Sequence, residues 1–348
     1  MISEFPLLVF TTLAGLAAGS YTMSAFFPVG QGSKRPWLFP LVCLVLLAAG
    51  LLCLPAHLEH PERMLIALSN PSAMIAQEAY WSIGFGIVLL ADVVLSKAKG
   101  ASPRALRIVG AVAGLGLACV MANAYFVSSA IVPWASWETF PLFIVGDLAM
   151  GAAFCALFER GLYEKTAFAA GTAVLGLLTC CAAVAEAVRF AGLGLGAAPF
   201  VVGAVAALAG AVCAALAGKG KLPAKAAGAL VFACLLAAVV VSRYAFYAVG
   251  GMYDEGRGAS HDGIEGHGSP VVLQGGRRGH RRVRRPVAGR LRRRQPGGNR
   301  KGRRSGSSIR RKRGRGRVGA CVVLAQLRRP LRKQSPREGR RGIATEDR

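Results

Sequence analysis

The sequence predicts an all-α integral membrane protein, and three observations lead to this fold class. Hydrophobic residues make up 53% of the 348-residue chain, more than an ordinary soluble protein contains. These residues are gathered in eight apolar runs separated by short polar segments. The basic balance of the chain comes mostly from its last part, because residues 253–348 carry a net charge of +22 and residues 1–252 carry +4. We therefore expect a membrane domain over residues 1–252 and a separate tail over residues 253–348.

Each apolar run is close to the roughly 20 residues that an α-helix needs to cross a bilayer. Glycine and alanine are abundant in the later runs, and small residues allow membrane helices to pack closely. The first run lacks the basic start of a cleavable signal peptide, so we expect it to be retained as a helix. We predict eight transmembrane helices, at about residues 5–27, 37–54, 73–96, 105–127, 139–158, 166–190, 199–218 and 226–250.

Basic residues in the short loops predict the orientation of these helices. Eleven Lys and Arg residues lie after the first, third, fifth and seventh runs, whereas Arg63 and Arg189 lie near the alternate loops. Cytoplasmic loops carry an excess of such residues. We therefore expect a multi-pass protein of the plasma membrane. Its N-terminus, the loop 55–72 and the end of the eighth helix would face outward.

A short similarity between two helix starts suggests an internal repeat. Residues 4–7 read EFPL at the start of the first helix, and residues 138–142 read ETFPL at the start of the fifth. Two parallel four-helix units would give this pattern. Chance, or the general preference for proline at a helix start, explains it nearly as well.

Ionisable residues inside the predicted helices mark the candidate site, because charges in a membrane are costly and are usually functional. At 1.5 Å per helical residue, Glu78, Asp147 and Arg243 all lie roughly 8–12 Å from the outer ends of their helices. Gln77 and Tyr125 add polar groups in the same half of the membrane. The sequence therefore predicts a polar, outward-facing pocket.

Other interpretations of these residues remain open at this stage. Glu78 at the headgroup level would simply be hydrated, and Asp147 with Arg243 would be a structural tie between helices. Arg243 could pair with either Asp147 or Glu78. Asp92 lies near the inner face, where we expect it to pair with Lys97 or to contact water.

The residue inventory excludes several kinds of redox centre from this chain. A haem between helices commonly needs axial histidines on those helices, but the membrane domain has two histidines, His57 and His60, both in one outer loop. The nine cysteines form no CxxC pair, which argues against an iron–sulfur cluster and a disulfide framework. We therefore expect no haem, no cluster and no metal site here.

A membrane quinol suits the pocket that remains. Oxidation of a quinol releases two electrons and two protons, and the protons need a base within hydrogen-bond reach. The carboxylate of Glu78 is such a base, and an imidazole at the mouth can pass protons to water near neutral pH. Since the chain has no electron acceptor of its own, a redox partner must dock on the outer face.

Several motifs, in order along the chain, resemble the membrane anchor subunit of dimethyl sulfoxide reductase. His57-Leu58-Glu59-His60-Pro61 matches its HLxxP pattern, and Glu78 falls where that family has a glutamate in the third helix. Two departures lie inside the first motif, where Glu59 replaces a common glycine and His60 a small or polar residue. The resemblance covers about residues 1–252, and its other matches are Phe5-Pro6-Leu7, Pro133-Trp134-Ala135-Ser136-Trp137, and Arg243 with Phe246-Tyr247.

The resemblance implies a function in anaerobic respiration. Such subunits hold a molybdopterin catalytic subunit and an iron–sulfur subunit on the outer face, oxidise menaquinol, and perform no terminal reduction themselves. Glu78 and His57 would then bind quinol and accept its protons. The residues that we expect to support this site are Gln77, His60, Arg63, Tyr125, Asp147 and Arg243.

The tail, residues 253–348, departs from this pattern. It is rich in Arg, Gly and Pro with almost no aromatic residues, a composition that predicts disorder. Binding to nucleic acid or anionic lipid would be the usual interpretation. We expect no nucleic-acid partner, because the predicted topology places the tail outside the cell. One hypothesis for its origin is a shifted reading frame in a GC-rich gene.

A transporter or channel with an outward-facing polar cavity is the alternative function. Transporters usually contain helices broken by glycine or proline near the middle of the membrane. Here the prolines cluster at helix ends and the charges lie in the outer half. This distribution favours the anchor subunit.

Overall fold

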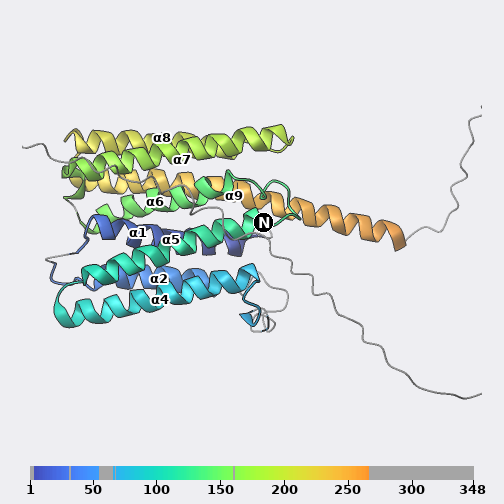
Figure 1. Ribbon diagram of the computed structural model, residues 1–348. Helices are drawn as coiled ribbons and strands as arrows, with labels where there is room; N and C mark the ends of the chain where they lie inside the picture. The colour runs from blue at the N-terminus through green and yellow to red at the C-terminus, as the bar shows by residue number, and fades with distance from the viewer. Residues whose placement is uncertain (1–3, 31–32, 55–65, 67, 160, 266–348) are drawn as a thin grey trace, which may run out of the picture. The chain divides into compact units, whose positions relative to one another are not determined.

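Figure 1 shows the computed structural model, which describes residues 4–265 apart from 31–32, 55–65, 67 and 160. The regular secondary structure of these residues is helical, with no β-strand among them. In chain order the elements are α1 (Phe5–Phe26), α2 (Leu38–Cys53), α4 (Met74–Lys99), α5 (Arg104–Phe126), α6 (Thr139–Phe158), the 3₁₀ helix η3 (Leu162–Glu164), α7 (Thr166–Gly192), α8 (Ala198–Gly218) and α9 (Ala224–Glu265).

The helix ends follow local sequence signals, so most bounds lie within two residues of the predicted ones. Pro6 stands in the first turn of α1 and Pro199 in that of α8, where a missing N–H costs nothing. Gly100 ends α4 at a φ of 72°, a left-handed conformation that glycine adopts without strain. The end of α9 differs, because it continues to Glu265, past the boundary predicted at residue 252.

Seven of the described helices are long and apolar enough to cross a membrane. The remaining apolar helix, α2, has 16 residues, and its length of about 24 Å is less than the roughly 30 Å of a bilayer core. The prediction of a helical multi-pass membrane protein is therefore confirmed, with seven to eight spanning helices.

The helices pack in two rings of four that repeat the same order. In the first ring α1 packs on α2, α2 on α4, α4 on α5, and α5 back on α1. In the second ring α6 packs on α7, α7 on α8, α8 on α9, and α9 back on α6. Figure 1 shows the two rings as neighbouring groups of helices. They meet where α1 packs against α6, flanked by contacts of α5 with α6 and of α1 with α9. This packing agrees with two four-helix units.

Glycines make the contact between α1 and α6 unusually close. A Cβ atom at Gly19 would overlap the backbone of Asp147, and one at Gly151 would overlap the backbone of Gly19. A Cβ atom at Gly15 would overlap the carboxylate of Asp147. Gly15 and Gly19 are four residues apart, the spacing that lets two membrane helices approach through one face. The centre of the molecule is thus built on small residues.

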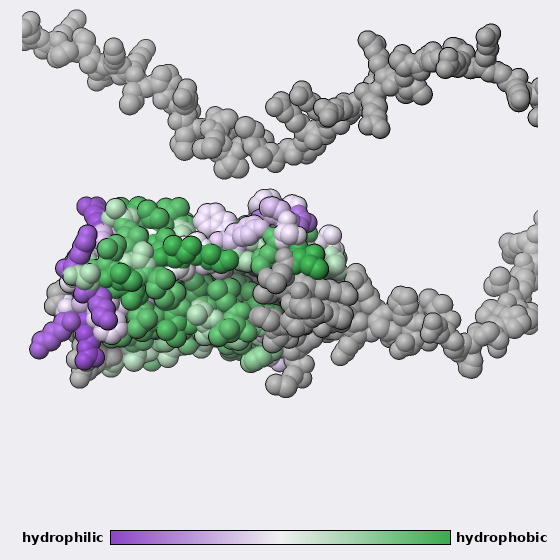
Figure 2. All heavy atoms as spheres, turned by 90° about the horizontal axis from the view of Figure 1, so that it is seen from below, coloured by the Kyte–Doolittle hydropathy of each residue, from purple (hydrophilic) through white to green (hydrophobic). Residues whose placement is uncertain are grey.

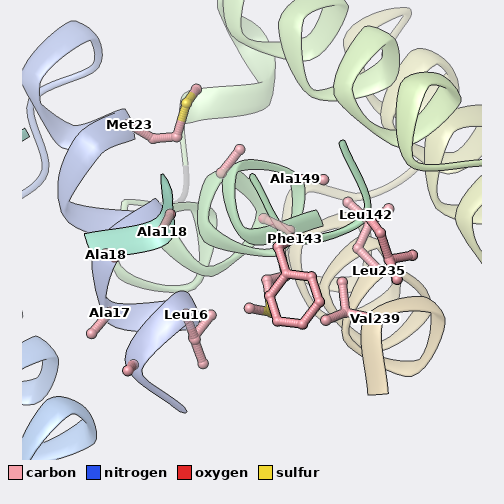
Figure 3. Packing of buried hydrophobic residues seen from close by; sticks show 14 of the residues in the cluster. Leu16, Ala17, Ala18, Met23, Ala118, Leu142, Phe143, Ala149, Leu235 and Val239 are labelled. Atoms are coloured by element: carbon pink, nitrogen blue, oxygen red, sulfur yellow. The ribbon is translucent and has the colours of Figure 1, made fainter. Parts of the chain in front are cut away.

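Apolar side chains complete the junction of the rings. Figure 3 shows Phe143 of α6 beside Val239 of α9. These side chains are buried and belong to one continuous cluster. Dispersion and close packing, rather than removal from water, hold such a core together inside a membrane.

The lateral surface is apolar and one end of the bundle is polar. Figure 2 looks onto the side that carries α4 and shows a hydrophobic band bordered at one end by hydrophilic residues. Large apolar side chains of α4 and α5, including Ile87, Val94 and Val112, are more than half exposed. Lys97, Lys99 and Arg104 are exposed at the turn between these two helices. A hydrocarbon environment around the band accounts for this distribution.

The close contact at Gly19 can be tested by a single methyl group. We expect Gly19→Ala to destabilise the protein by about 1–3 kcal/mol, because its Cβ would meet backbone atoms that cannot move aside. Thermal unfolding of the purified protein in detergent measures the loss. Gly171→Ala is the matched control, since nothing lies within 4 Å of its Cβ. Equal stability of the two variants would contradict the tight crossing of α1 and α6.

Candidate functional site

Six polar side chains from five helices meet inside the bundle, near the end where the chain begins. We call this group the polar cluster. Every member is buried, with the exposed fraction of each at 7% or less. The members are Thr11 of α1, Glu78 of α4, Tyr125 of α5, Asp147 of α6, and Arg243 and Tyr247 of α9.

Arg243 is the centre of the cluster and is fully buried. Its Nη2 donates to Oδ1 of Asp147 at 2.6 Å, and its Nη1 donates to the backbone oxygen of Thr11 at 2.7 Å. The guanidinium carbon also lies 4.5 Å from the centre of the Phe143 ring, a cation–π contact. Arg243 therefore pairs with Asp147 rather than with Glu78, which answers the question that the sequence left open.

Glu78 is buried in the same cluster, and no ion pair joins it to a cation within the described part of the chain. Its exposed fraction is 7%, and its Oε1 has no hydrogen-bond partner among the described residues. It interacts electrostatically with Tyr125 and Tyr247, and both tyrosines also interact with Arg243. Simple hydration at the membrane surface does not describe this environment. An unsatisfied buried oxygen is costly, and it is available to a ligand that can donate a hydrogen bond.

Aromatic rings fix the two tyrosines in position. The Tyr125 ring lies 5.3 Å from the rings of Trp134 and Phe143 and 5.4 Å from that of Tyr247. Trp134 is itself held by its indole N–H, which donates to the backbone oxygen of Phe246 at 2.7 Å. On the other side, the Tyr247 hydroxyl donates to Oγ1 of Thr11 at 3.1 Å. These contacts hold the hydroxyls of Tyr125 and Tyr247 in position near Glu78.

Of the remaining predicted residues, the structure describes Gln77 alone, and the side chain of Gln77 does not join this cluster. Gln77 is one residue from Glu78, but its side chain donates to the backbone oxygen of Pro71 at 3.4 Å. Together with Tyr80, whose hydroxyl donates to Leu68, it holds the end of the preceding loop on α4. The other three predicted residues, His57, His60 and Arg63, lie outside the described residues.

Asp92 corrects a prediction. The sequence suggested pairing with Lys97 or contact with water, but Asp92 is 2% exposed. It accepts hydrogen bonds from the Tyr21 hydroxyl at 2.7 Å and from Oγ of Ser96 at 2.9 Å. Ser96 is four residues further along α4 and shares its buried face, whereas Lys97 lies on an exposed face. Asp92 therefore ties α4 to α1 and belongs to no exposed site.

Two residues that contact Arg243 were not predicted from the sequence. Thr11 contributes a backbone oxygen to Arg243 and a hydroxyl to Tyr247, yet a threonine in an apolar run carries no distinctive signal. Phe143 lies under the guanidinium and gives even less indication in the sequence. The glycine at position 15 was a usable signal, because a gap on α1 is needed where Asp147 lies.

The cluster can do limited but specific chemistry. Glu78 offers a carboxylate oxygen that can accept a hydrogen bond and then a proton. The hydroxyls of Tyr125 and Tyr247 can donate to a carbonyl or accept from a hydroxyl. The positive charge of Arg243 is balanced by Asp147. The pair therefore holds its helices together and does not neutralise the charge of Glu78.

The ion pair can be tested by breaking it and then replacing it. We expect Asp147→Asn to destabilise the protein by about 3–5 kcal/mol, because it leaves the buried Arg243 guanidinium without a counter-charge. The double variant Asp147→Leu with Arg243→Met should recover much of that loss, since both charges are removed together. Thermal unfolding in detergent compares the variants. A double variant as unstable as the single one would show that the pair is not a self-contained unit.

Comparison with known proteins gives no assignment for this chain. A scan against protein-family models and a search of curated proteins both find no match. Function is therefore inferred from the chemistry of the polar cluster together with the motifs of the sequence.

Proposed function

We propose that this chain is the membrane anchor subunit of a dimethyl sulfoxide reductase-type complex and that it oxidises menaquinol at the polar cluster. The observation that carries the proposal is the buried carboxylate of Glu78, whose Oε1 lacks a hydrogen-bond partner among the described residues. A quinol hydroxyl is a donor that would satisfy this oxygen. The two tyrosine hydroxyls beside it support the same assignment.

Each residue has a defined task in this reaction. Glu78 accepts a hydrogen bond from one quinol hydroxyl and then takes its proton as a general base. The proton of the second hydroxyl leaves through the loop 55–72, where His57 is the proposed carrier. The two electrons pass to an iron–sulfur partner subunit, and the product is the quinone. Tyr125 and Tyr247 orient the substrate ring through their hydroxyls.

The distribution of charge supports an outward-facing site. Exposed basic residues, among them Lys34, Lys97 and Lys219, lie at the end of the bundle opposite the polar cluster. Basic residues mark the cytoplasmic side of a membrane protein. We therefore place the polar cluster, the start of α1 and the outer end of the spanning part of α9 on the outer side of the plasma membrane.

The segment between α5 and α6 is the proposed contact for the iron–sulfur partner. Trp137 in this segment is 72% exposed and contacts the rings of Phe126 and Phe140. Trp134 in the same segment packs directly on Tyr125 of the polar cluster. A partner bound on Trp137 would thus lie close to the proposed quinol, as electron transfer requires.

The alternative of a transporter or channel receives less support. A route for a polar solute along α4 would have to pass its buried face, which carries Glu78 and Asp92 towards its two ends. Between them Phe85 and Leu89 are fully buried and apolar. Each described helix of the two rings also continues without a break through its length. These features favour a closed bundle with a site at one end.

The role of Glu78 can be tested by a nearly isosteric change. In the complete complex we expect Glu78→Gln to lower the oxidation rate of a menaquinol analogue by about 100-fold or more, because the general base is lost. Assembly should persist, since the amide keeps the volume of the side chain. The control is Glu164→Gln, an exposed carboxylate in η3 at the other end of the bundle. Unchanged turnover in Glu78→Gln would remove the site assignment.

The proposed contact with the iron–sulfur partner at Trp137 can be tested by comparing two exposed aromatic residues. Trp137→Ala should reduce the amount of iron–sulfur subunit that co-purifies with the membrane subunit, because it removes the main exposed aromatic side chain of the segment between α5 and α6. Phe26→Ala is the control, since Phe26 is 71% exposed at the opposite end of the bundle. Equal losses of partner in both variants would contradict docking at Trp137.

A further inference from the structure

A further buried carboxylate, outside the polar cluster as defined above, lies in the second ring of helices. Glu186 is near the end of α7, and its exposed fraction is 0%. Neither of its oxygens has a hydrogen-bond partner among the described residues. Few buried carboxylates lack both hydrogen bonds and a close counter-charge, so this group needs an explanation.

Two charged residues act on Glu186 through space. Glu138, half-buried just before α6, repels it, and Arg189, one turn further along α7, attracts it. Arg189 is otherwise engaged, because its Nη2 donates to the backbone oxygen of Val132 at 2.9 Å and its Nε to that of Pro133 at 3.4 Å. Its guanidinium is thus directed to the segment between α5 and α6, and Glu186 is left without a close ion pair within the described chain.

The physical cost of this arrangement points to a bound proton. An ionised carboxylate that is buried without hydrogen bonds loses its hydration without compensation, and a second carboxylate nearby adds repulsion. A bound proton removes both costs at once. A metal cation would instead need several oxygen ligands, and the described residues contain no group of three or more His, Cys, Asp or Glu side chains that could hold one.

We propose that Glu186 is a proton-binding site that exchanges protons with water at this end of the bundle through Glu138. Glu138 is suited to that task because it is partly exposed while it still interacts with Glu186. The site is separate from Glu78 and does not depend on the oxidation of quinol. Its ligand is the proton itself, bound on an oxygen of a carboxyl group inside the second ring.

Infrared spectroscopy of the full chain in detergent tests the proposal directly. The difference spectrum between mildly acidic and mildly alkaline conditions should contain the carbonyl band of a protonated carboxyl group, and Glu186→Gln should abolish that component. Glu164→Gln changes an exposed carboxylate and should leave the component in place. Glu78→Gln should also leave it in place, which separates this site from the proposed quinol site. A component unaffected by Glu186→Gln would overturn the proposal.

Chemical labelling of the unaltered chain keeps the proposal testable if the variant fails to fold. A hydrophobic carbodiimide reacts with protonated carboxyl groups in apolar surroundings, and mass spectrometry locates the adduct. We expect labelling at Glu186 that falls severalfold as the pH is raised. Glu138→Gln should lower the labelling further at a given pH, because the repulsion that favours the bound proton is gone. Absence of label on Glu186 at every pH would contradict a bound proton.

Discussion

The buried ion pair between Arg243 and Asp147 is the interaction on which the rest of the structure depends. It lies where the two rings of helices meet, and it joins α9 to α6 while a second hydrogen bond reaches α1. Two charges can be held at this depth because each partner compensates the other and a second guanidinium nitrogen donates to the backbone oxygen of Thr11. Gly15 of α1 leaves room for the carboxylate of Asp147, so the ion pair also depends on a glycine at this position.

The pair also determines the electrostatic surroundings of Glu78. If Arg243 had turned to Glu78, that carboxylate would be neutralised and would be a poor base. The guanidinium of Arg243 binds Asp147 instead. Glu78 therefore has tyrosine hydroxyls near it, which can orient a ligand but supply no counter-charge. A similar division occurs in the second ring, where Arg189 donates to backbone oxygens and Glu186 has no hydrogen-bond partner in the part of the chain that the structure describes. In both places an arginine is engaged in hydrogen bonds, and a buried acid nearby has a carboxylate oxygen without a hydrogen-bond partner among the described residues.

The sequence predicted the helices well and the contacts between side chains incompletely. Helix ends follow proline, glycine and the limits of apolar runs, which are local signals. The choice of Asp147 for Arg243 depends on which faces of α6 and α9 meet, and no single segment encodes that. The burial of Asp92 could have been predicted from its spacing, because it shares one helical face with residues 78, 82, 85, 89 and 96. All six residues are buried in the structure. Thr11 and Phe143 lacked any signal of their own.

The central claim is that a quinol binds beside Glu78, and photochemical cross-linking in native membranes tests it most directly. The whole complex would be illuminated with a photoreactive menaquinone analogue, and the labelled peptides would be identified by mass spectrometry. The account predicts attachment to α4 near Glu78 and to the segments that carry Tyr125 and Tyr247. Attachment confined to lipid-facing positions, such as Val184 and Val201 in the apolar groove between α7 and α8, would contradict it.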